Sequence, residues 1–307
     1  MAVPKPLVPV LVGPTGVGKT ALAVALARYW PLVVISADSR QVYRGLDAGT
    51  GKPTMEQRRA VEHLGIDVLD PGERYSAGRF ARDAVAWLSA VPAGRQAVIV
   101  GGTGLYIRAL VEGLFREPPL DPTRRAELAR WTAAASGLGR WAARLDLAYS
   151  GGGRQRAART VEVALLTGRP LSWWQQRARA EGVMRPWYVR LTAPRAVLHQ
   201  RITQRVAGML RAGWVDEVQR LLAAGLTAQT PGLDALGYRE IARHIERSLP
   251  AERLQDAIVS CTRRYAKRQE TWFRHQLGAA PCLTLDATDA PEALAARVAA
   301  RWEEVKR

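Results

Sequence analysis

The sequence predicts an α/β protein in which a parallel sheet is flanked by helices and interrupted by an all-helical insertion. Three observations lead to this prediction. Short, β-branched apolar runs alternate with helix-forming segments over roughly the first hundred residues. The first of these runs ends in a glycine-rich turn that opens a helix. Between residues 117 and 183 the chain changes to helix-forming segments separated by proline and glycine, which predicts a separate helical unit.

The first run, Val10–Val12, leads into a phosphate-binding loop pattern, and an alanine- and leucine-rich helix follows to Leu26. In such a loop, glycines let successive backbone N–H groups face phosphate oxygens, and the helix N-terminus adds partial positive charge. A plain glycine-rich turn would need neither the lysine nor the flanking strand and helix. We therefore expect a sheet like that of P-loop NTPases. The residues predicted to bind phosphate are Gly13, Pro14, Thr15, Gly16, Val17, Gly18, Lys19 and Thr20.

Two more strands are expected before the insertion. Pro31–Ser36 is a β-branched run followed by Asp38, which places this carboxylate at the carboxyl edge of a parallel sheet, where ligands bind. Gln96–Val100 is the next strand. A nucleotide hydrolase often ends such a strand in an acid that helps to hold Mg²⁺, but glycines and Thr103 follow it here. The missing acid weakens a plain ATPase interpretation.

Helices are expected within the insertion at 121–135, 138–148 and 155–167, the last of them ended by Gly168. The predicted division is therefore a core of residues 1–116 and 184–307, with an inserted unit of residues 117–183.

After the insertion, Trp187–Thr192 is expected to return the chain to the sheet. A helix over 196–211 follows, with Arg201 and Arg205 one turn apart on its polar side, and a second helix covers 214–224. The segment 259–276 is the most basic part of the chain and is also expected to be helical, and 283–286 is expected to be an edge strand before a terminal helix.

Charge is the informative feature of the composition. The chain of 307 residues has 45 Lys+Arg against 28 Asp+Glu, a net charge of +17, which favours a polyanionic partner such as nucleic acid over an arginine-rich composition without a partner. Cys261 and Cys282 form no Cys-x-x-Cys pair, so neither a zinc site nor a disulfide framework is predicted. With no signal-peptide pattern and no apolar run of membrane-spanning length, we expect a cytoplasmic protein that binds no membrane.

Seven segments, in order along nearly the whole chain, resemble the tRNA dimethylallyltransferase family, which prenylates adenosine 37 beside the anticodon. They are GPTGVGKT (13–20), SADSRQVYRGLDAGTGKPT (36–54), GGTGLYIRAL (101–110), QRAARTVEVALLTGRPLS (155–172), QRITQRVAGMLRAGWVDEV (200–218), ALGYRE (235–240) and AKRQETWFR (266–274). The chain is similar to the bacterial form. It departs from the family at Ser150–Arg154, where a His-Pro-Asn-Asp-like turn is usual.

The resemblance implies a reaction and a set of roles. Dimethylallyl diphosphate would occupy the loop, with Mg²⁺ held in part by Thr20, and its five-carbon group would pass to N6 of the adenine. Asp38 would be the general base, and Arg205, or else Arg201, would stabilise the leaving diphosphate. The remaining implied contacts are with tRNA, from Asp38, Ser39, Arg40, Gln41, Thr103, Arg125, Gln155, Arg156, Arg159, Gly237, Tyr238, Arg239, Lys267, Arg268, Gln269, Thr271, Trp272 and Arg274.

Three alternatives remain at this point. An adenylate-type isopentenyltransferase uses the same core on a free nucleotide, but a small acceptor would need neither the basic helical insertion nor AKRQETWFR. A P-loop kinase for a small molecule and a non-catalytic RNA-binding protein are the other two. We also expect a monomer.

Overall fold

The apolar runs form a six-stranded sheet in the computed structural model, which describes residues 5–115, 118–178 and 180–306. Every strand pair is parallel, and the strand order is β3-β2-β4-β1-β5-β6. The strands are β1 (Leu7–Val12), β2 (Leu32–Ala37), β3 (Glu62–Leu64), β4 (Gln96–Gly101), β5 (Arg185–Thr192) and β6 (Cys282–Asp286). The parallel α/β fold is confirmed, and β6 is the expected edge strand.

The sheet order determines what surrounds the phosphate loop. β4 lies between β1 and β2, so the phosphate loop after β1 and Asp38 after β2 are separated by the glycines that follow β4. All three segments lie at the carboxyl edge, where a crevice forms at the point in the sheet at which the strand order reverses. The short strand β3, the helix α2 (Met55–Ala60) and the helix α3 (Ala77–Ala90) were not expected from the sequence.

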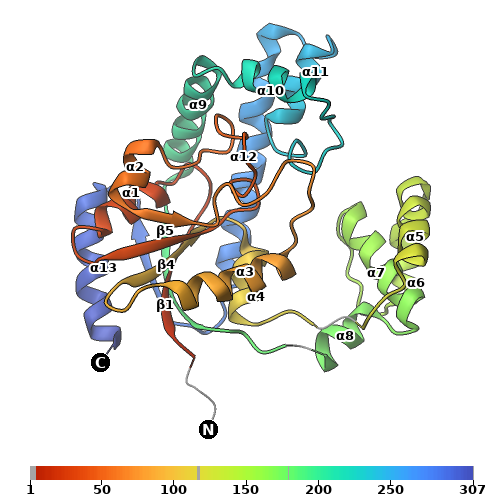
Figure 1. Ribbon diagram of the computed structural model, residues 1–307, viewed down its shortest axis with the longest axis horizontal. Coiled ribbons are helices and arrows are strands. Elements are labelled where there is room, and N and C mark those ends of the chain that lie inside the picture. The colour runs from red at the N-terminus through yellow and green to blue at the C-terminus, as the bar shows by residue number, and fades with distance from the viewer. Residues whose placement is uncertain (1–4, 116–117, 179, 307) are drawn as a thin grey trace. The chain divides into compact units, whose positions relative to one another are not determined.

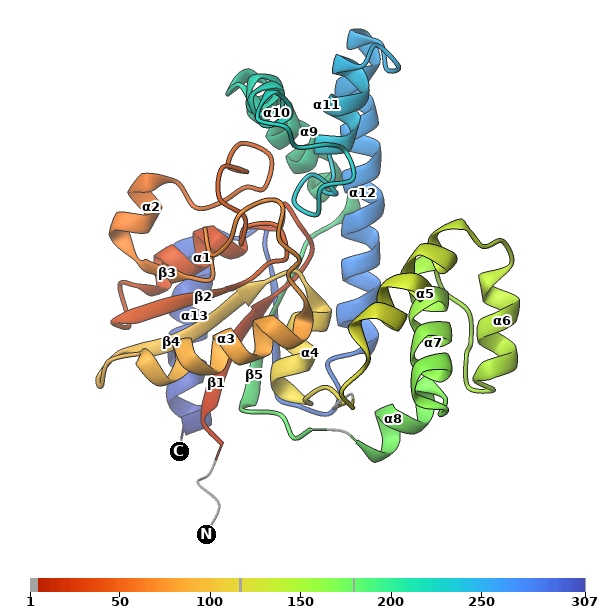
Figure 2. The same ribbon diagram turned by 45° about the vertical axis from the view of Figure 1, so that its right-hand side comes forward.

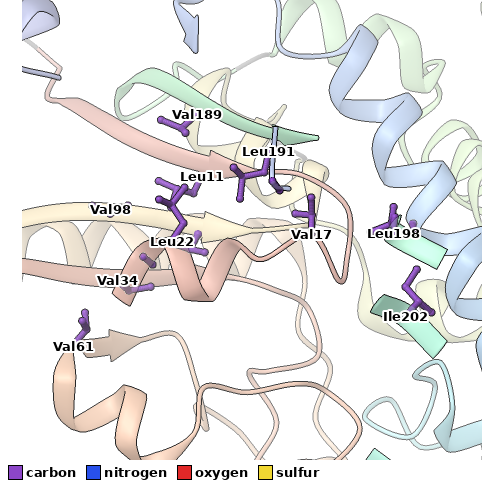
Figure 3. Close-up of a cluster of buried hydrophobic side chains, with 14 of the residues drawn as sticks. Leu11, Val17, Leu22, Val34, Val61, Val98, Val189, Leu191, Leu198 and Ile202 are labelled. Atoms are coloured by element: carbon purple, nitrogen blue, oxygen red, sulfur yellow. The ribbon is translucent and has the colours of Figure 1, made fainter. Parts of the chain in front are cut away.

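Helices cover both faces of the sheet. On one face α1 (Lys19–Leu26) packs against α13 (Pro291–Lys306), and Figure 3 shows Leu22 of α1 beside Leu11, Val34 and Val98 of the strands. On the opposite face from α13 lie α3 and α4 (Gly104–Val111) (Figure 2). Every strand residue of β2 is buried, as a strand covered on both faces requires.

Four helices form a group beyond the carboxyl edge of the sheet (Figure 1). They are α9 (Arg195–Arg211), α10 (Trp214–Ala223), α11 (Tyr238–Ile245) and α12 (Ala251–His275). Gly213 separates α9 from α10 with a φ of 89°, a conformation that glycine adopts without strain. The basic helix α12 begins after Pro250 and not at residue 259 as expected, and it packs against α9 and α11.

The chain divides into two compact units, one of Met1–Leu110 with Met184–Arg307 and one of Val111–Val183. The boundary predicted between residues 116 and 117 lies outside the described residues. None of the described helices combines the length and the apolarity that crossing a membrane requires.

The second unit contains α5 (Pro122–Ala134), α6 (Leu138–Leu145), α7 (Arg154–Thr167) and α8 (Leu171–Arg177). Its core is built from α6 and α7. α6 is shorter than expected because the buried Asp146 leaves the helix and accepts hydrogen bonds from the N–H of Ala148 at 3.0 Å and of Ser172 at 2.8 Å. Gly168 ends α7, as predicted, with a φ of 66°.

The turn before α7 is built from glycines and is held by Arg154. Gly151 and Gly152 adopt positive φ, and Arg154 extends back to the end of α5. Its guanidinium donates to the carbonyls of Thr132, Ala133 and Ala135 at 2.7, 2.7 and 2.8 Å. These carbonyls at the end of a helix have no partner within it, so Arg154 supplies the missing donors.

Candidate functional site

Two cavities meet at the carboxyl edge of the sheet. The larger, about 630 Å³, is lined by the phosphate loop, Asp38, residues 50–53 and one side of α9. The smaller, about 340 Å³, is lined by α9, Trp214, the segment 234–239 and α12. Thr15, Asp38, Thr50 and Arg205 line both. The junction of the cavities is therefore where a group bound in one could reach a group bound in the other.

The phosphate loop has the backbone that its glycines allow. Gly13, Gly16 and Gly18 have φ values of 148°, 81° and 106°. A Cβ at Gly13 would lie 2.6 Å from the carbonyl oxygen of Leu191, so only glycine lets the loop pass β5. Thr20 lies in the first turn of α1 and lines the larger cavity, as does Lys19.

Lys19 folds back into its own loop. Its ammonium donates to the carbonyls of Gly13 at 2.8 Å and Pro14 at 2.9 Å. Burial lowers the pKa of Lys19 to about 8, with Arg205 acting in the same direction and Asp38 against it. An anion in the larger cavity would favour the charged ammonium and raise that pKa.

Asp38 is fixed by the turn that follows β2. Its Oδ1 accepts from the N–H of Arg40 at 2.8 Å, and the Ser39 N–H donates to the Thr103 hydroxyl at 3.1 Å. The Thr103 side chain is also hydrogen-bonded to Tyr265, whose pKa is raised to about 12, by burial first and then by the nearby Asp38. Asp38, Ser39 and Thr103 are thus brought together at the carboxyl edge of the sheet, where Asp38 was expected.

The neighbouring polar residues are held within the protein. The Gln41 amide donates to the Gly51 carbonyl at 3.0 Å and accepts from the Ser36 hydroxyl at 2.8 Å. Arg40 donates to the Pro231 carbonyl at 2.9 Å. Gln41 lines the larger cavity and Arg40 the smaller one, so both shape the site while bonded to other segments.

The two candidate arginines of α9 have different positions. Arg201 donates to the carbonyl of Ala287 at 2.8 Å and to that of Val17 at 3.4 Å, so it links the phosphate loop to the segment after β6. Arg205 lies at the junction of the cavities, against the backbone of Gly51. Of the two arginines, Arg205 is therefore the one that lies where the two cavities meet.

The donors for a metal ion are few. Among residues 5–115, 118–178 and 180–306 no group of three His, Cys, Asp or Glu side chains could hold a metal. The Thr20 hydroxyl and the Asp38 carboxylate line the same cavity and are hard oxygen donors. This set fits Mg²⁺, which commonly takes one or two protein oxygens and completes its shell with phosphate and water.

α12 presents two different faces. Lys267, Arg268, Thr271 and Arg274 are exposed, as an RNA-binding surface requires. Gln269 is only 6% exposed: it accepts from the Thr15 N–H at 2.8 Å and donates to the Gly102 carbonyl at 2.9 Å. The expectation that Gln269 contacts tRNA is therefore corrected, because both ends of its amide bind the protein interior. Trp272 is half-buried against Gly104.

The glycines after β4, which stand where a hydrolase acid was expected, let α12 approach the sheet. A Cβ at Gly102 would overlap the Gln269 amide, and one at Gly104 would overlap the Trp272 ring.

The expected tRNA contacts of Gly237 and Tyr238 are also corrected. Both are buried, and the Tyr238 hydroxyl donates to Glu217 at 2.6 Å. Arg239, by contrast, is exposed and paired with Asp234.

In the second unit the four predicted RNA-contact residues differ in availability. Arg125 and Arg159 both pair with Glu162, at 2.6 and 3.2 Å. Gln155 and Arg156 are exposed in the first turn of α7.

Glu217 and Lys52 lie in segments that resemble the family, but the sequence does not indicate what their side chains do. Glu217 is a buried carboxylate within an amphipathic helix, a pattern typical of an exposed side chain. The Lys52 ammonium, its side chain 3% exposed, donates to the Tyr43 carbonyl and to Asp47, each at 2.6 Å. Only the glycines of the Gly-Thr-Gly-Lys segment indicate an unusual loop there.

A family model described as IPP transferase matches residues 41–276. The chain belongs to the IPP transferase family. This membership confirms the resemblance seen in the sequence and the expected class of enzyme, a prenyltransferase, and it sets aside the small-molecule kinase and the non-catalytic RNA-binding protein.

Curated relatives and solved structures agree. A protein named tRNA dimethylallyltransferase from Syntrophobacter fumaroxidans is 43% identical over 85% of this chain and 79% of its own length. One of the same name from Albidiferax ferrireducens is 41% identical over 92% of this chain and 87% of its own. The crystal structure of the tRNA isopentenylpyrophosphate transferase from Bacillus halodurans matches with a TM-score of 0.71 and 31% identity, covering 98% of this chain and 97% of that one. A eukaryotic dimethylallyltransferase, 24% identical over 92% of this chain and 74% of its own, shares the fold with a TM-score of 0.76.

Proposed function

We propose that this chain transfers the dimethylallyl group of dimethylallyl diphosphate to N6 of adenosine 37 in tRNA and releases diphosphate. The observation that carries this proposal is the meeting of two cavities at Asp38 and Arg205, one lined by a phosphate loop and the other by α9–α12. A transferase with two substrates needs such a junction. The names of the relatives supply the substrates.

The larger cavity suits the diphosphate. Backbone N–H groups of the phosphate loop, the Lys19 ammonium and the Arg205 guanidinium surround it. As the carbon–oxygen bond to the diphosphate breaks, negative charge gathers on the leaving oxygens. Preorganised donors at that position can each contribute on the order of 3 kcal/mol to the transition state.

Mg²⁺, when bound, would supply further positive charge to those oxygens. Thr20 is the residue that could hold it, with phosphate oxygens and water as the other ligands.

Asp38 suits the role of general base. The exocyclic amine of adenine is a weak nucleophile, so its proton should pass to a carboxylate as the nitrogen–carbon bond forms. The turn bonds from Arg40 hold the Asp38 carboxyl group in place at the cavity junction. In balance, one N–C bond forms, one C–O bond breaks, and the amine proton goes to Asp38.

The smaller cavity suits the adenine. Its wall combines apolar side chains of α9, such as Val206 and Met209, with Tyr265, which can stack on a base. A base in an anticodon loop leaves its stack at a cost of a few kcal/mol, less than in a duplex. Exposed basic residues near the cavity, Arg239 and Arg268 among them, would hold the surrounding phosphates.

The test is transfer of radiolabelled dimethylallyl from its diphosphate to an anticodon stem-loop containing adenosine 37. A stem-loop with inosine at 37 is the matched control, because inosine has an oxygen in place of the N6 amine. We expect label on the adenosine stem-loop and none on the inosine one. Label on free AMP but not on RNA would instead identify the adenylate-type enzyme.

A further inference from the structure

Residues 47–53, which we call the wall loop, form the partition beside the two cavities. Gly49 and Thr50 line the smaller cavity, and Thr50, Gly51, Lys52 and Pro53 line the larger one. Gly51 has a φ of 63°, and a Cβ there would overlap the Arg205 guanidinium. The shape of the wall loop therefore decides where Arg205 can lie.

A carboxylate from α10 holds one end of the wall loop. Oε2 of Glu217 accepts from the N–H of Asp47 at 2.9 Å and of Ala48 at 2.8 Å. Glu217 is 7% exposed, so these bonds are shielded from water. Removing one partner of a buried charged group costs the full desolvation of the other, which makes this contact sensitive to substitution.

Tyr238, the first residue of α11, completes the arrangement. Its hydroxyl donates to Oε1 of Glu217 at 2.6 Å and accepts from the Gly49 N–H at 3.3 Å. Burial and the Glu217 carboxylate raise the pKa of Tyr238, so the hydroxyl stays protonated and can donate. Three successive N–H groups of the wall loop thus donate hydrogen bonds to this one pair of side chains.

The backbones of the wall loop and of the residue before α11 both pack against Trp214. The indole of Trp214 lies between Gly49 of the wall loop and Gly237 before α11, and a Cβ on either glycine would overlap its ring. Trp214 is 2% exposed and packs edge-on against Tyr238 with ring centroids 5.5 Å apart. The wall loop and α10–α11 are therefore one packed assembly.

The other end of the wall loop faces the reacting groups. The Gly51 carbonyl accepts from Gln41, whose amide is in turn bonded to Ser36 at the end of β2, next to Asp38. A displacement of residues 47–49 would pass through Thr50 to Gly51, and hence to Arg205 and the Asp38 turn.

We propose that Glu217 and Tyr238 are positioning residues, which fix the wall loop so that Arg205 and Asp38 meet at the cavity junction. This inference rests on the proposed function for its catalytic consequence. The two side chains line neither cavity, so the pair acts through the loop. It gives the segment 235–240, which the sequence indicated as an RNA contact, a role in the chemical step.

The test compares Tyr238→Phe with Tyr75→Phe. Tyr75 is a matched control, because its hydroxyl also donates to a carboxylate at 2.6 Å, that of Asp83, but lines neither cavity. We expect Tyr238→Phe to lower kcat for RNA prenylation about tenfold, since small misplacements of reacting groups have effects of that size or larger. KM for the stem-loop should stay within about twofold, because the RNA surface is intact. Tyr75→Phe should leave both constants within about twofold of the wild type.

Glu217→Gln keeps the shape of the side chain and removes its charge. Because the two residues act as one unit, the double variant should lose little more kcat than Tyr238→Phe alone. A fall in Tm for Tyr238→Phe with kcat unchanged would overturn the inference. So would a loss confined to KM for the stem-loop, which would place Tyr238 on the RNA surface.

Hydrogen exchange gives a readout that needs no activity. In the wild type the N–H groups of Asp47, Ala48 and Gly49 should exchange slowly, and Tyr238→Phe should accelerate Gly49 while Tyr75→Phe does not. If the wild type shows this protection but transfers no prenyl group, the proposed function fails and the positioning contact stands. If Gly49 exchanges equally fast in all variants, the contact itself is refuted.

Discussion

Asp38 has a structural task in the turn after β2 and, in the proposed reaction, a chemical one. Its Oδ1 closes the turn after β2, and its carboxyl group also lines both cavities. An asparagine at this position keeps an oxygen for the Arg40 N–H but cannot take a proton from an amine. The substitution therefore separates the turn from the chemistry.

We predict that Asp38→Asn lowers kcat for prenyl transfer about 100-fold or more, the range that general-base catalysis contributes. RNA binding should be retained, because the turn and the basic surface persist. Single-turnover transfer and a filter-binding assay with the stem-loop measure the two. Asp70→Asn, at an exposed pair with Arg44, is the control. A twofold or smaller loss in Asp38→Asn would exclude Asp38 as the base.

Lys19 predicts a pH dependence of diphosphate binding. Its pKa is about 8 without ligand, because burial disfavours the ammonium. A bound anion stabilises the ammonium, so the complex holds a proton that the free protein loses above pH 8. Affinity should therefore be level below that pH and fall above it, to about one tenth between pH 7 and 9. Calorimetry with inorganic diphosphate tests this. In Lys19→Met the part of the fall in affinity that is due to the lysine should be absent. An equal pH dependence in both proteins would contradict the assignment.

At the scale of elements, α12 joins the proposed RNA surface to the phosphate loop. Its exposed face carries Lys267 and Arg268, and its buried face carries Gln269, which binds the phosphate loop at Thr15 and the Gly102 carbonyl. One helix thereby contributes to both proposed substrate sites, and its close packing explains why small glycines follow β4 in place of a hydrolase acid.

Substitutions on the two faces of α12 should affect different properties of the protein. Gln269→Leu leaves two polar backbone groups without partners, so the free energy of unfolding should fall by about 2 kcal/mol, and diphosphate should bind more weakly. Lys267→Ala should leave stability unchanged and reduce the slope of log affinity for RNA against log salt by about one. Denaturant unfolding and salt titrations of stem-loop binding measure these effects. Weaker stem-loop binding by Gln269→Leu, with the free energy of unfolding and diphosphate binding unchanged, would return that residue to the RNA surface.

The elements differ in how far the sequence predicts them. Strands β1, β2, β4 and β5 are predicted because burial on both faces imposes continuous apolar runs. β3 is not predicted because it has only three residues, none of them buried. The phosphate loop is predicted by its spacing, whereas Glu217 is not, because its burial follows from a loop 170 residues away in the sequence. Motif segments such as 235–240 indicate importance, but whether a side chain faces RNA or the core depends on tertiary packing.

At the scale of the whole molecule, the charge of +17 is divided between two compact units. The unit of Met1–Leu110 with Met184–Arg307 contains both cavities, so diphosphate binding should depend on it alone. RNA is long enough to engage residues of both units. A change in the Val111–Val183 unit should therefore alter RNA affinity and leave diphosphate affinity unchanged.

Arg156 and Arg125 allow a sharp test of this division, because both are exposed on the second unit but differ in their partners. Arg125 pairs with Glu162 at 2.6 Å, so binding a phosphate would require that ion pair to be broken or shared. Arg156→Ala should reduce the salt slope for stem-loop binding by about one, and Arg125→Ala should reduce it by less. Both variants should bind inorganic diphosphate like the wild type. If Arg156→Ala leaves the slope unchanged, or if either variant weakens diphosphate binding, the proposed division of substrates between the units is wrong.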